Sequence, residues 1–503
     1  MRPRRLVAFG LACMSYASAS QTIPEAGRPA SPAERRQLLN TNQRLARENQ
    51  RIERASERHR INYATLRSAL AQRLSVNRDI SDSELIALVE STAREAAEAR
   101  SAIAGLRAQA AAVAVPPPTR ETEQAIGLAE RGFTAGRFDE ARRSLAEIRL
   151  QRQQAARVEQ SRPAVVAWLN AIDAEARTAI LQGDHADAAD LYLAAMAEPG
   201  LNHAVRLRLA YLAADMFGRS ARFTGRTEPV RRQVAILHGT ALPLVPREKY
   251  PVEWADTMND LGFALHNLGH MLDSRSTLED SLTAYREAIK VYEEVRQPGK
   301  VADTLINVAN SQFRIAELDG RPNGIEEAVR TYRLAQRTIT RARAPLAWAV
   351  IQGNIGVALT ALAKREGGLS QYPEAIAVLR ESLAITTFDL APRQWATGQI
   401  NLALALGGFG RRTNDASLME EAVAAYEAGL KVWTRNEHPF RWASIRLDQA
   451  EIAARIARLA KDRTALGKTL TSVREARGVA VELAASELVE QADRILAELE
   501  SPN

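Results

Sequence analysis

The chain has 503 residues, of which 46% are hydrophobic and 5% aromatic, and its formal net charge is +7. Ala, Leu, Arg and Glu are abundant, which favours helix over strand and predicts an all-α protein. Arginines alternate with acidic residues along the whole chain, whereas phosphate tracking needs a concentrated basic stripe. Nucleic acid is therefore not expected as a partner.

Residues 1–19 predict a cleaved signal peptide. Arginines precede a short apolar stretch at 6–12, and small residues at 17–19 resemble a cleavage site. Cleavage would remove Cys13, the only cysteine, and place the mature chain in the periplasm or outside the cell. Lipidation of Cys13 is the weaker alternative, because residues 10–12 make a poor lipobox. No later segment approaches 18 uninterrupted apolar residues, so no transmembrane segment is expected in the mature chain.

Residues 20–32 contain several prolines and predict a flexible leader. Residues 33–115 predict N-terminal helices that could mediate homo-oligomerisation. Up to about residue 74 the chain is highly charged, and Leu38, Leu45 and Ile52 recur every seven residues. The alternate seam positions are the polar Asn42 and Asn49, which leaves either a weak coiled coil or a long exposed helix.

A capping-box pattern, Ser81-Asp82-Ser83-Glu84, predicts the start of a helix that runs to about Val113. Pro116, Pro117 and Pro118 end that helix, because proline cannot donate a backbone hydrogen bond. We therefore expect a linker and a domain boundary at residues 116–120.

Residues of the same type recur every 47 positions in the C-terminal half. The prolines are Pro251, Pro298, Pro345, Pro392 and Pro439, and three residues after each come Trp254, Val301, Trp348, Trp395 and Trp442. Small residues follow at Gly262, Ala309, Gly356, Ala403 and Ala450, and large ones at Tyr285, Tyr332, Leu379, Tyr426 and Val473.

Each 47-residue unit predicts a pair of helices. Helix A begins near the proline, which suits a first helical turn, and helix B carries the large residue. One pair cannot bury its apolar face alone, so successive pairs must stack. Residues 251–484 thus predict five regular repeats, and residues 485–503 a capping helix and tail. A Gly-x-aromatic-or-His pattern that begins at Gly136 and returns at Gly183 predicts degenerate repeats over 121–250.

Short strings within these units resemble tetratricopeptide repeats, of the long-period bacterial and kinesin-light-chain-like variety. They are NDLGFAL (259–265), GNIGVAL (353–359), EEAVRTY (326–332) and EEAVAAY (420–426). The resemblance covers residues 121–484 and implies a right-handed solenoid of helical hairpins. The usual period is about 34 residues, and the excess is assigned to a longer start of helix A and a longer turn inside the pair.

The resemblance also implies that a peptide or protein partner binds the concave face presented by helix A. Matched residue by residue, the family pattern places the following residues on that face: Asp256, Asn259, Phe263, His266, Asn267, Asp303, Ile306, Asn310, Phe313 and Arg314. Later repeats place small or apolar residues there, such as Val357, Ala361 and Leu404. The groove is therefore expected to be polar at one end and apolar at the other.

A ladder of polar residues recurs in helix A with the same period. Its members are Asp260, Asn307, Asn354, Asn401 and Asp448. The amides could hydrogen-bond a ligand backbone, or they could tie one repeat to the next, and the second interpretation is favoured.

Catalytic and metal chemistry find little support in the sequence. His266 and His270 stand four apart, but they lack further ligands, and Gly407-Gly408-Phe409-Gly410 lacks the Lys-Ser/Thr of a phosphate loop. We predict a non-enzymatic, exported adaptor without metal or cofactor. The alternative is a self-assembling structural spacer with an empty groove, and a metal-dependent or hydrolytic enzyme is less favoured.

Overall fold

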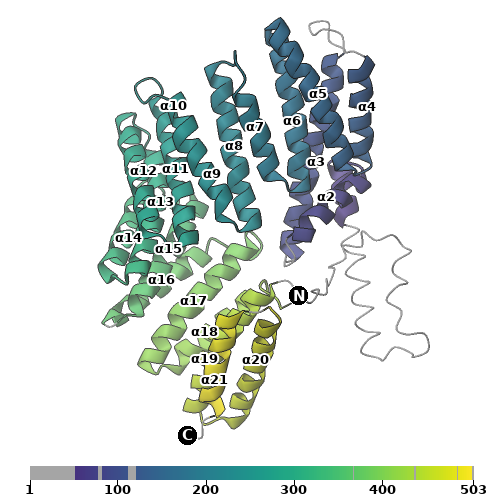
Figure 1. Cartoon of the computed structure of the whole chain (residues 1–503). Helices are drawn as coiled ribbons and strands as arrows, with labels where there is room; N and C mark the ends of the chain where they lie inside the picture. The colour runs from purple at the N-terminus through teal and green to yellow at the C-terminus, as the bar shows by residue number, and fades with distance from the viewer. Residues whose placement is uncertain are drawn as a thin grey trace, which may run out of the picture. The chain divides into compact units, whose positions relative to one another are not determined.

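The computed structural model describes residues 51–76, 82–110, 120–365, 367–435, 438–483 and 485–500. These residues form helices joined by turns, and none of them lies in a strand, which confirms the all-α prediction. The chain divides into two compact units, Met1–Leu244 and Val245–Asn503 (Figure 1). The predicted signal peptide, leader and nearly all of the 116–120 linker lie outside the described residues.

The first unit consists mainly of antiparallel helical hairpins. Its elements are α2 (Tyr63–Val76), α3 (Asp82–Ala110), α4 (Arg120–Thr134), α5 (Phe138–Glu159), α6 (Arg162–Gln182), α7 (His185–Met196), α8 (His203–Thr224), α9 (Thr227–Ile236), a π-helical turn (Leu237–Ala241) and α10 (Leu242–Leu244). The α4–α5 and α6–α7 pairs turn at Gly136 and Gly183, both with positive φ. The two hairpins therefore follow the 47-residue step predicted between these glycines.

The N-terminal helices pack into the core of this unit, unlike the predicted coiled coil or long exposed helix. The helical residues 51–58 end in a turn where Arg60 is left-handed, and α2 then begins at Tyr63. Ile52, Leu66 and Leu70 are at most 1% exposed and share a core with residues of α3 to α6. Ile52 is thus buried by helices of its own unit and does not lie in a coiled-coil seam. Leu38 and Leu45 lie outside the described residues.

The domain boundary expected at 116–120 is also wrong. Residues of α3 and α4, on either side of the proline run, contribute to the same core. Prolines end a helix, but they do not prevent the next helix from packing back onto it. The division between the units lies at Leu244 and Val245 instead.

The second unit contains the five predicted repeats. The A helices are α11 (Pro251–Leu272), α13 (Pro298–Asp319), α15 (Pro345–Ala363), α17 (Pro392–Thr413) and α19 (Pro439–Leu459). Their partners are α12 (Arg275–Glu294), α14 (Pro322–Ala335), α16 (Tyr372–Leu383), α18 (Ala416–Leu430) and α20 (Arg463–Glu482), with α21 (Ser486–Glu500) as the final helix. Each A helix begins at its predicted proline, and α21 packs on α19 and α20.

The 47-residue repeat is longer than the usual repeat of about 34 residues, and the extra residues lie only partly at the predicted positions. Helix A is long, as expected, but the turn inside the pair is short, for example Asp273 and Ser274 between α11 and α12. The third pair is the exception, with a 3-10 turn at Gly368–Gln371. Elsewhere the excess lies in loops between pairs, such as residues 336–344 between α14 and α15.

The turn inside each pair contains one residue with positive φ, and these residues again recur every 47 positions. They are Asp273, Gly320, Gly367, Asn414 and Lys461, with φ between 49° and 77°. Glycine adopts this left-handed conformation without strain, and Asn or Asp adopts it more readily than most residues. The same backbone device therefore reverses the chain in all five hairpins.

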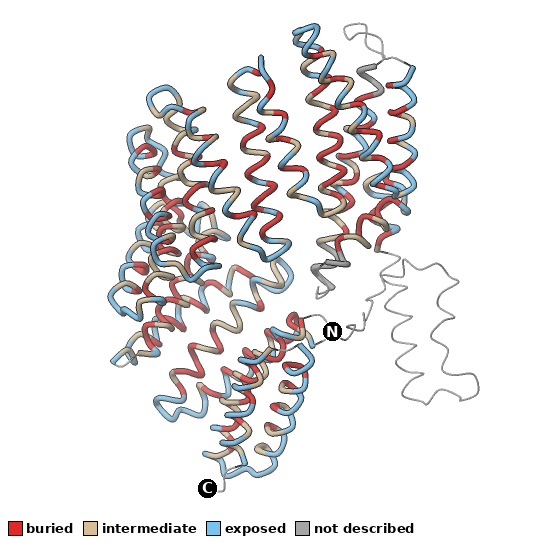
Figure 2. Tube along the Cα trace, in the orientation of Figure 1, coloured by how far each residue is buried: buried red, intermediate tan, exposed pale blue. Residues whose placement is uncertain are grey.

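Helices within a pair approach closely at the small residues of helix A. A Cβ atom added to Gly262 would lie 2.6 Å from the Tyr285 ring, and one added to Gly356 would lie 2.4 Å from Leu379. Figure 2 shows the buried stretches on helix faces that turn toward neighbouring helices within the unit. The largest core extends from Ala302 to Ile495.

One described helix, α15, is long and apolar enough to cross a bilayer, with a mean hydropathy of 1.6 over its best window. That window is 56% buried inside the protein, and Ile351, Ile355 and Leu359 belong to the core shared with α16 and α17. This is the packing of a central repeat helix.

Candidate functional site

The predicted contact residues on α11 and α13 are largely tied to neighbouring side chains. Asp256 accepts hydrogen bonds from Tyr292, at 2.6 Å, and from Lys300, at 2.5 and 2.7 Å. Arg314 forms ion pairs with Asp273 and Glu317. Phe263 is 42% exposed and Asp303 is also exposed. The polar end of the predicted groove therefore consists mostly of contacts between adjacent hairpins.

Members of the polar ladder also join neighbouring A helices. Asn307 donates to Asn259 and Asn354 donates to Asn310, each across 3.4 Å. At the far end, Asp448 accepts from Gln491 of α21 at 3.1 Å, and burial raises the pKa of Asp448. At three of its positions, the ladder therefore ties one repeat or helix to the next, as the favoured interpretation predicts.

Asn401 differs from these ladder residues. Its side chain makes no hydrogen bond within the described part of the chain, and it lines a hollow of about 330 Å³. The residue that corresponds to Asn310 in the next repeat is Val357, which has no amide to accept a hydrogen bond from Asn401. The amide is thus available to a ligand.

The hollow lies across three successive A helices, α13, α15 and α17. Its lining comprises Phe313, Glu317, Val357, Thr360, Ala361, Lys364, Arg365, Asn401 and Leu404. Val357, Ala361 and Leu404 are the residues that the sequence placed at the apolar end of the groove, and Phe313 is a predicted contact residue of the preceding repeat. The structure brings them together around one concavity.

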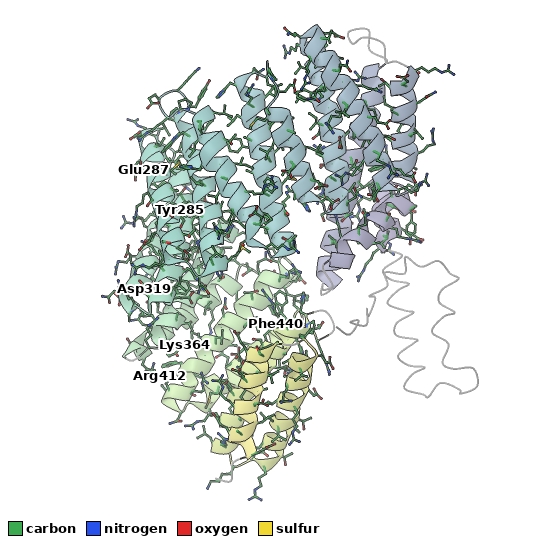
Figure 3. All side chains as sticks on the ribbon, in the orientation of Figure 1. Tyr285, Glu287, Asp319, Lys364, Arg412 and Phe440 are labelled. Carbon is green, nitrogen blue, oxygen red and sulfur yellow. The ribbon has the colours of Figure 1, made fainter. Side chains whose placement is uncertain are left out.

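The cations beside the hollow differ in their surroundings. Arg365 donates to the backbone carbonyl of Gly320 at 2.5 Å, and Arg412 from the next hairpin donates to that of Ala363 at 2.6 Å. The side chain of Lys364, by contrast, is exposed and forms no ion pair or hydrogen bond with any described residue, although its charge acts on Asp448. Figure 3 labels Lys364 and Arg412 on adjacent A-helix ends.

Sequence reasoning missed Lys364, Arg365, Glu317 and Thr360 as lining residues. The 47-residue repeat could have identified two of them. Glu317 lies one helical turn after the predicted Phe313 and Arg314, and Lys364 occupies the same position in the next repeat, 47 residues later. An apolar hollow with a free amide and a free ammonium group can take an apolar side chain together with polar groups of the same ligand.

His266 and His270 do not form a metal centre. The ring centroids are 6.4 Å apart, and His266 Nδ1 lies 2.8 Å from Ser311 Oγ. No group of three or more His, Cys, Asp or Glu side chains within the described ranges could hold a metal ion. Burial, followed by the nearby His270 and Arg314, lowers the pKa of His266 to about 4.

This lowered pKa predicts a pH-dependent stability. An unfolded imidazole titrates near 6.5, so the unfolded chain binds more protons than the folded chain between about pH 6.5 and 4. Stability is therefore lost as the pH falls through that window, by up to about 3 kcal/mol from this residue. Urea unfolding at pH 7 and pH 4 should show a smaller pH effect for His266→Gln than for the wild type. The exposed His238 provides the control, since His238→Gln leaves the surroundings of His266 unchanged and should leave the pH effect close to that of the wild type.

Comparisons with known proteins agree with the repeat structure. Residues 264–299 match the tetratricopeptide repeat model. A comparison with curated protein sequences gave no match. Among solved structures, the apo form of RapI is 12% identical with a TM-score of 0.40 and covers 76% of this chain and 96% of its own. A Rap protein complexed with competence and sporulation factor is 13% identical with a TM-score of 0.34, covering 76% and 98%.

The yeast Tom70 structure is 10% identical to this chain with a TM-score of 0.26, and the match covers 75% of this chain and 97% of that one. The family match lies on the end of α11, the whole of α12 and the start of α13, within the array of 47-residue hairpins. The chain thus contains a tetratricopeptide repeat, at residues 264–299.

Proposed function

We propose that this protein is an interaction adaptor that binds a peptide or protein segment on the A-helix face of Val245–Asn503. The observation that carries the proposal is the 330 Å³ hollow, in which an unpaired amide and an unpaired ammonium group border an apolar lining. Tetratricopeptide arrays typically serve as non-enzymatic scaffolds for protein partners, which agrees with this arrangement.

The hollow suits one anchoring side chain of a partner. An apolar side chain of Leu or Phe size would contact Phe313, Val357 and Leu404, and its burial would contribute roughly 1.5–3 kcal/mol. The Asn401 amide would hydrogen-bond the partner's backbone, and Lys364 would pair with a carboxylate. Such an anchor resembles the small set of central residues that usually dominates binding energy at an interface.

The test is crosslinking in the native host with a variant that puts charge into the hollow. Val357→Asp together with Leu404→Asp should lower capture of the partner at least about tenfold, because a buried, unpaired carboxylate opposes an apolar anchor. The matched control is Leu334→Asp on α14, a residue that is 44% exposed and lies outside the hollow. Equal capture by the folded double variant, or capture only of further copies of this chain, would overturn the adaptor proposal in favour of a structural spacer.

We further propose that the chain is exported and that residues 1–19 are removed. The basic, apolar and small-residue order of this segment supports the proposal. N-terminal sequencing of the protein from its native host is expected to give a chain that begins near Ser20. A chain that begins at a lipidated Cys13 would support the lipoprotein alternative, and an intact N-terminus in the cytoplasm would refute export.

A further inference from the structure

A groove of about 780 Å³ lies between the B helices α12 and α14. Its lining consists of residues of α12 between Arg275 and Arg286, the start of α14, and side chains from the second half of α13. Figure 3 labels Asp319, the lining residue at which α13 ends. We call it the B-helix groove, and it shares no lining residue with the 330 Å³ hollow. We propose that the B-helix groove binds an acidic segment of a partner protein.

Successive B helices are elsewhere joined by a repeated ion pair. Arg333 of α14 pairs with Glu374 of α16, and Arg380 of α16 pairs with Glu421 of α18 at 2.5 Å. The two arginines stand 47 residues apart, and so do the two glutamates. The same ion pair therefore recurs at the same position of two successive repeats.

The corresponding ion pair is absent between α12 and α14. The 47-residue step assigns its positions to Arg286 and Glu327, which both line the B-helix groove but form no ion pair with each other. Glu327 instead accepts a hydrogen bond from Gln312 of α13 at 2.7 Å. Two later repeats carry the buried Leu359 and Leu406 at the position of Gln312. The glutamine thus engages the carboxylate, and Arg286 is exposed without a hydrogen bond or ion pair to any described residue.

The other arginines of the groove differ in how far they are neutralised. Arg275 pairs with Glu279 at 2.9 Å and with Asp319 at 3.2 Å, so its charge is balanced within the protein. Arg321 and Arg330 approach a carboxylate only to 3.8 Å, and their side chains are 69% and 67% exposed. Such exposed ion pairs are weak. Together with the unpaired guanidinium group on α12, three arginines of the groove can therefore donate to a ligand.

The apolar core does not continue across the groove. The large core from Ala302 to Ile495 includes residues of α14 but none of α12. Leu282 and Tyr285 of α12 belong instead to a small cluster with Val308 of α13. Neither a shared core nor the repeated ion pair therefore closes the space between α12 and α14.

The shape and chemistry of the groove suit an extended acidic peptide. Its α12 side runs from Arg275 to Arg286, about 16 Å of helix, which is the length of about five residues of extended chain. Most of its lining is polar or charged, whereas pockets for drug-sized ligands are mainly apolar. Guanidinium groups bind carboxylates through directed, charge-assisted hydrogen bonds. A glutamate or aspartate of the partner would thus take the place that Glu374 and Glu421 hold in the next two repeats.

An unpaired cation alone does not define this site, since Lys364 beside the hollow also lacks an ion pair. The B-helix groove is distinguished by its concavity, by the repeat position that names the missing carboxylate, and by the glutamine that accounts for its loss. The proposal concerns a different surface from the hollow and does not depend on it.

The test measures binding of a short fluorescein-labelled peptide, in which glutamate alternates with serine, to the full chain by fluorescence anisotropy. Arg286→Gln together with Arg330→Gln is expected to weaken binding about tenfold, because two exposed ion pairs with the peptide are lost. The control, Arg380→Gln together with Arg474→Gln, removes the same charge at two equivalents of Arg286 on α16 and α20. It should leave the affinity close to that of the wild type.

Gln312→Leu tests the cause without removing a cation. The substitution restores the leucine that later repeats carry and releases Glu327 to pair with Arg286. We expect about threefold weaker binding of the acidic peptide, with no loss of stability in urea unfolding. A matched peptide with glutamine in place of glutamate should bind neither the wild type nor this variant.

The proposal is overturned by equal binding of the glutamate and glutamine peptides, by an equal loss of affinity in the control variant, or by undiminished binding in either groove variant. Displacement of the peptide by an equal concentration of inorganic pyrophosphate would show that the groove takes a free anion, and would also overturn it. The hollow variant, Val357→Asp with Leu404→Asp, should bind the acidic peptide like the wild type, so that this proposal and the adaptor proposal fail independently.

Discussion

Replacing Arg73 by alanine is expected to destabilise the unit Met1–Leu244 by about 3–5 kcal/mol. Arg73 is 5% exposed, near the end of α2. Its guanidinium group donates to Thr92 at 3.0 Å, to the Ile180 carbonyl at 2.7 Å and to the Leu181 carbonyl at 3.3 Å, and it forms an ion pair with Glu95. One side chain thus joins α2, α3 and the end of α6.

The large effect follows from what the substitution leaves behind. A partly buried Glu95 carboxylate without its ion-pair partner and a Leu181 carbonyl without its side-chain donor cost more than the bonds to water that the intact arginine gave up. Hydrogen exchange of α2 and α3, together with urea unfolding, measures the loss. Arg73→Met combined with Glu95→Gln should recover part of the stability, because it also removes the unpaired charge.

The matched control for Arg73 is Arg137→Ala. Arg137 pairs with Glu140 at 2.7 Å, and both side chains are at least half exposed. Such surface pairs contribute less than about 1 kcal/mol. Equal destabilisation by the two alanine substitutions would contradict the role given to Arg73.

Replacing Gly356 by valine is expected to destabilise the third hairpin of the second unit by about 3 kcal/mol. A Cβ atom at this position would lie 2.4 Å from Leu379 Cγ, and Leu379 is 1% exposed and has little room to move. The helices α15 and α16 would have to separate. Loss of hydrogen-exchange protection in both helices, with a lower urea midpoint, is the expected measurement.

Gly353, three residues earlier on α15, provides the control. The closest atom to its added Cβ would be Ser382 Oγ, at an ordinary contact distance of 3.5 Å. Gly353→Ala should therefore stabilise the helix by roughly 0.5–1 kcal/mol, since alanine restricts the unfolded chain more than glycine does. Adding Leu379→Ala to Gly356→Val should restore stability if the clash is the cause.

The sequence predicts the second unit well because each of its features is local and repeated. Prolines mark the first turn of every A helix, and the 47-residue step fixes which residues share a helix face. The apolar part of the hollow follows from this register. The 47-residue step does not predict that the side chains of Asn401 and Lys364 lack hydrogen bonds and ion pairs. That depends on whether a neighbouring residue carries a group that could bond to them.

The first unit is harder to predict because its decisive contacts are distant in sequence. Arg73 meets carbonyl groups more than 100 residues away, at Ile180 and Leu181. The sequence around Ile52 shows a heptad spacing, yet intramolecular helices bury that residue. Periodicity identifies an apolar side of a helix, but it does not identify the helix that covers it.

The left-handed residue in each hairpin turn of the second unit has a consequence for how this array can change in length. Asp273, Gly320, Gly367, Asn414 and Lys461 mark the same point of five units. Inserting a single residue within an α-helix would turn every later side chain by about 100° and move the apolar side away from its neighbour. Gain or loss of a whole 47-residue unit would leave each remaining interface with an equivalent partner. The array is modular, and its evolution or redesign is expected to proceed by whole hairpins.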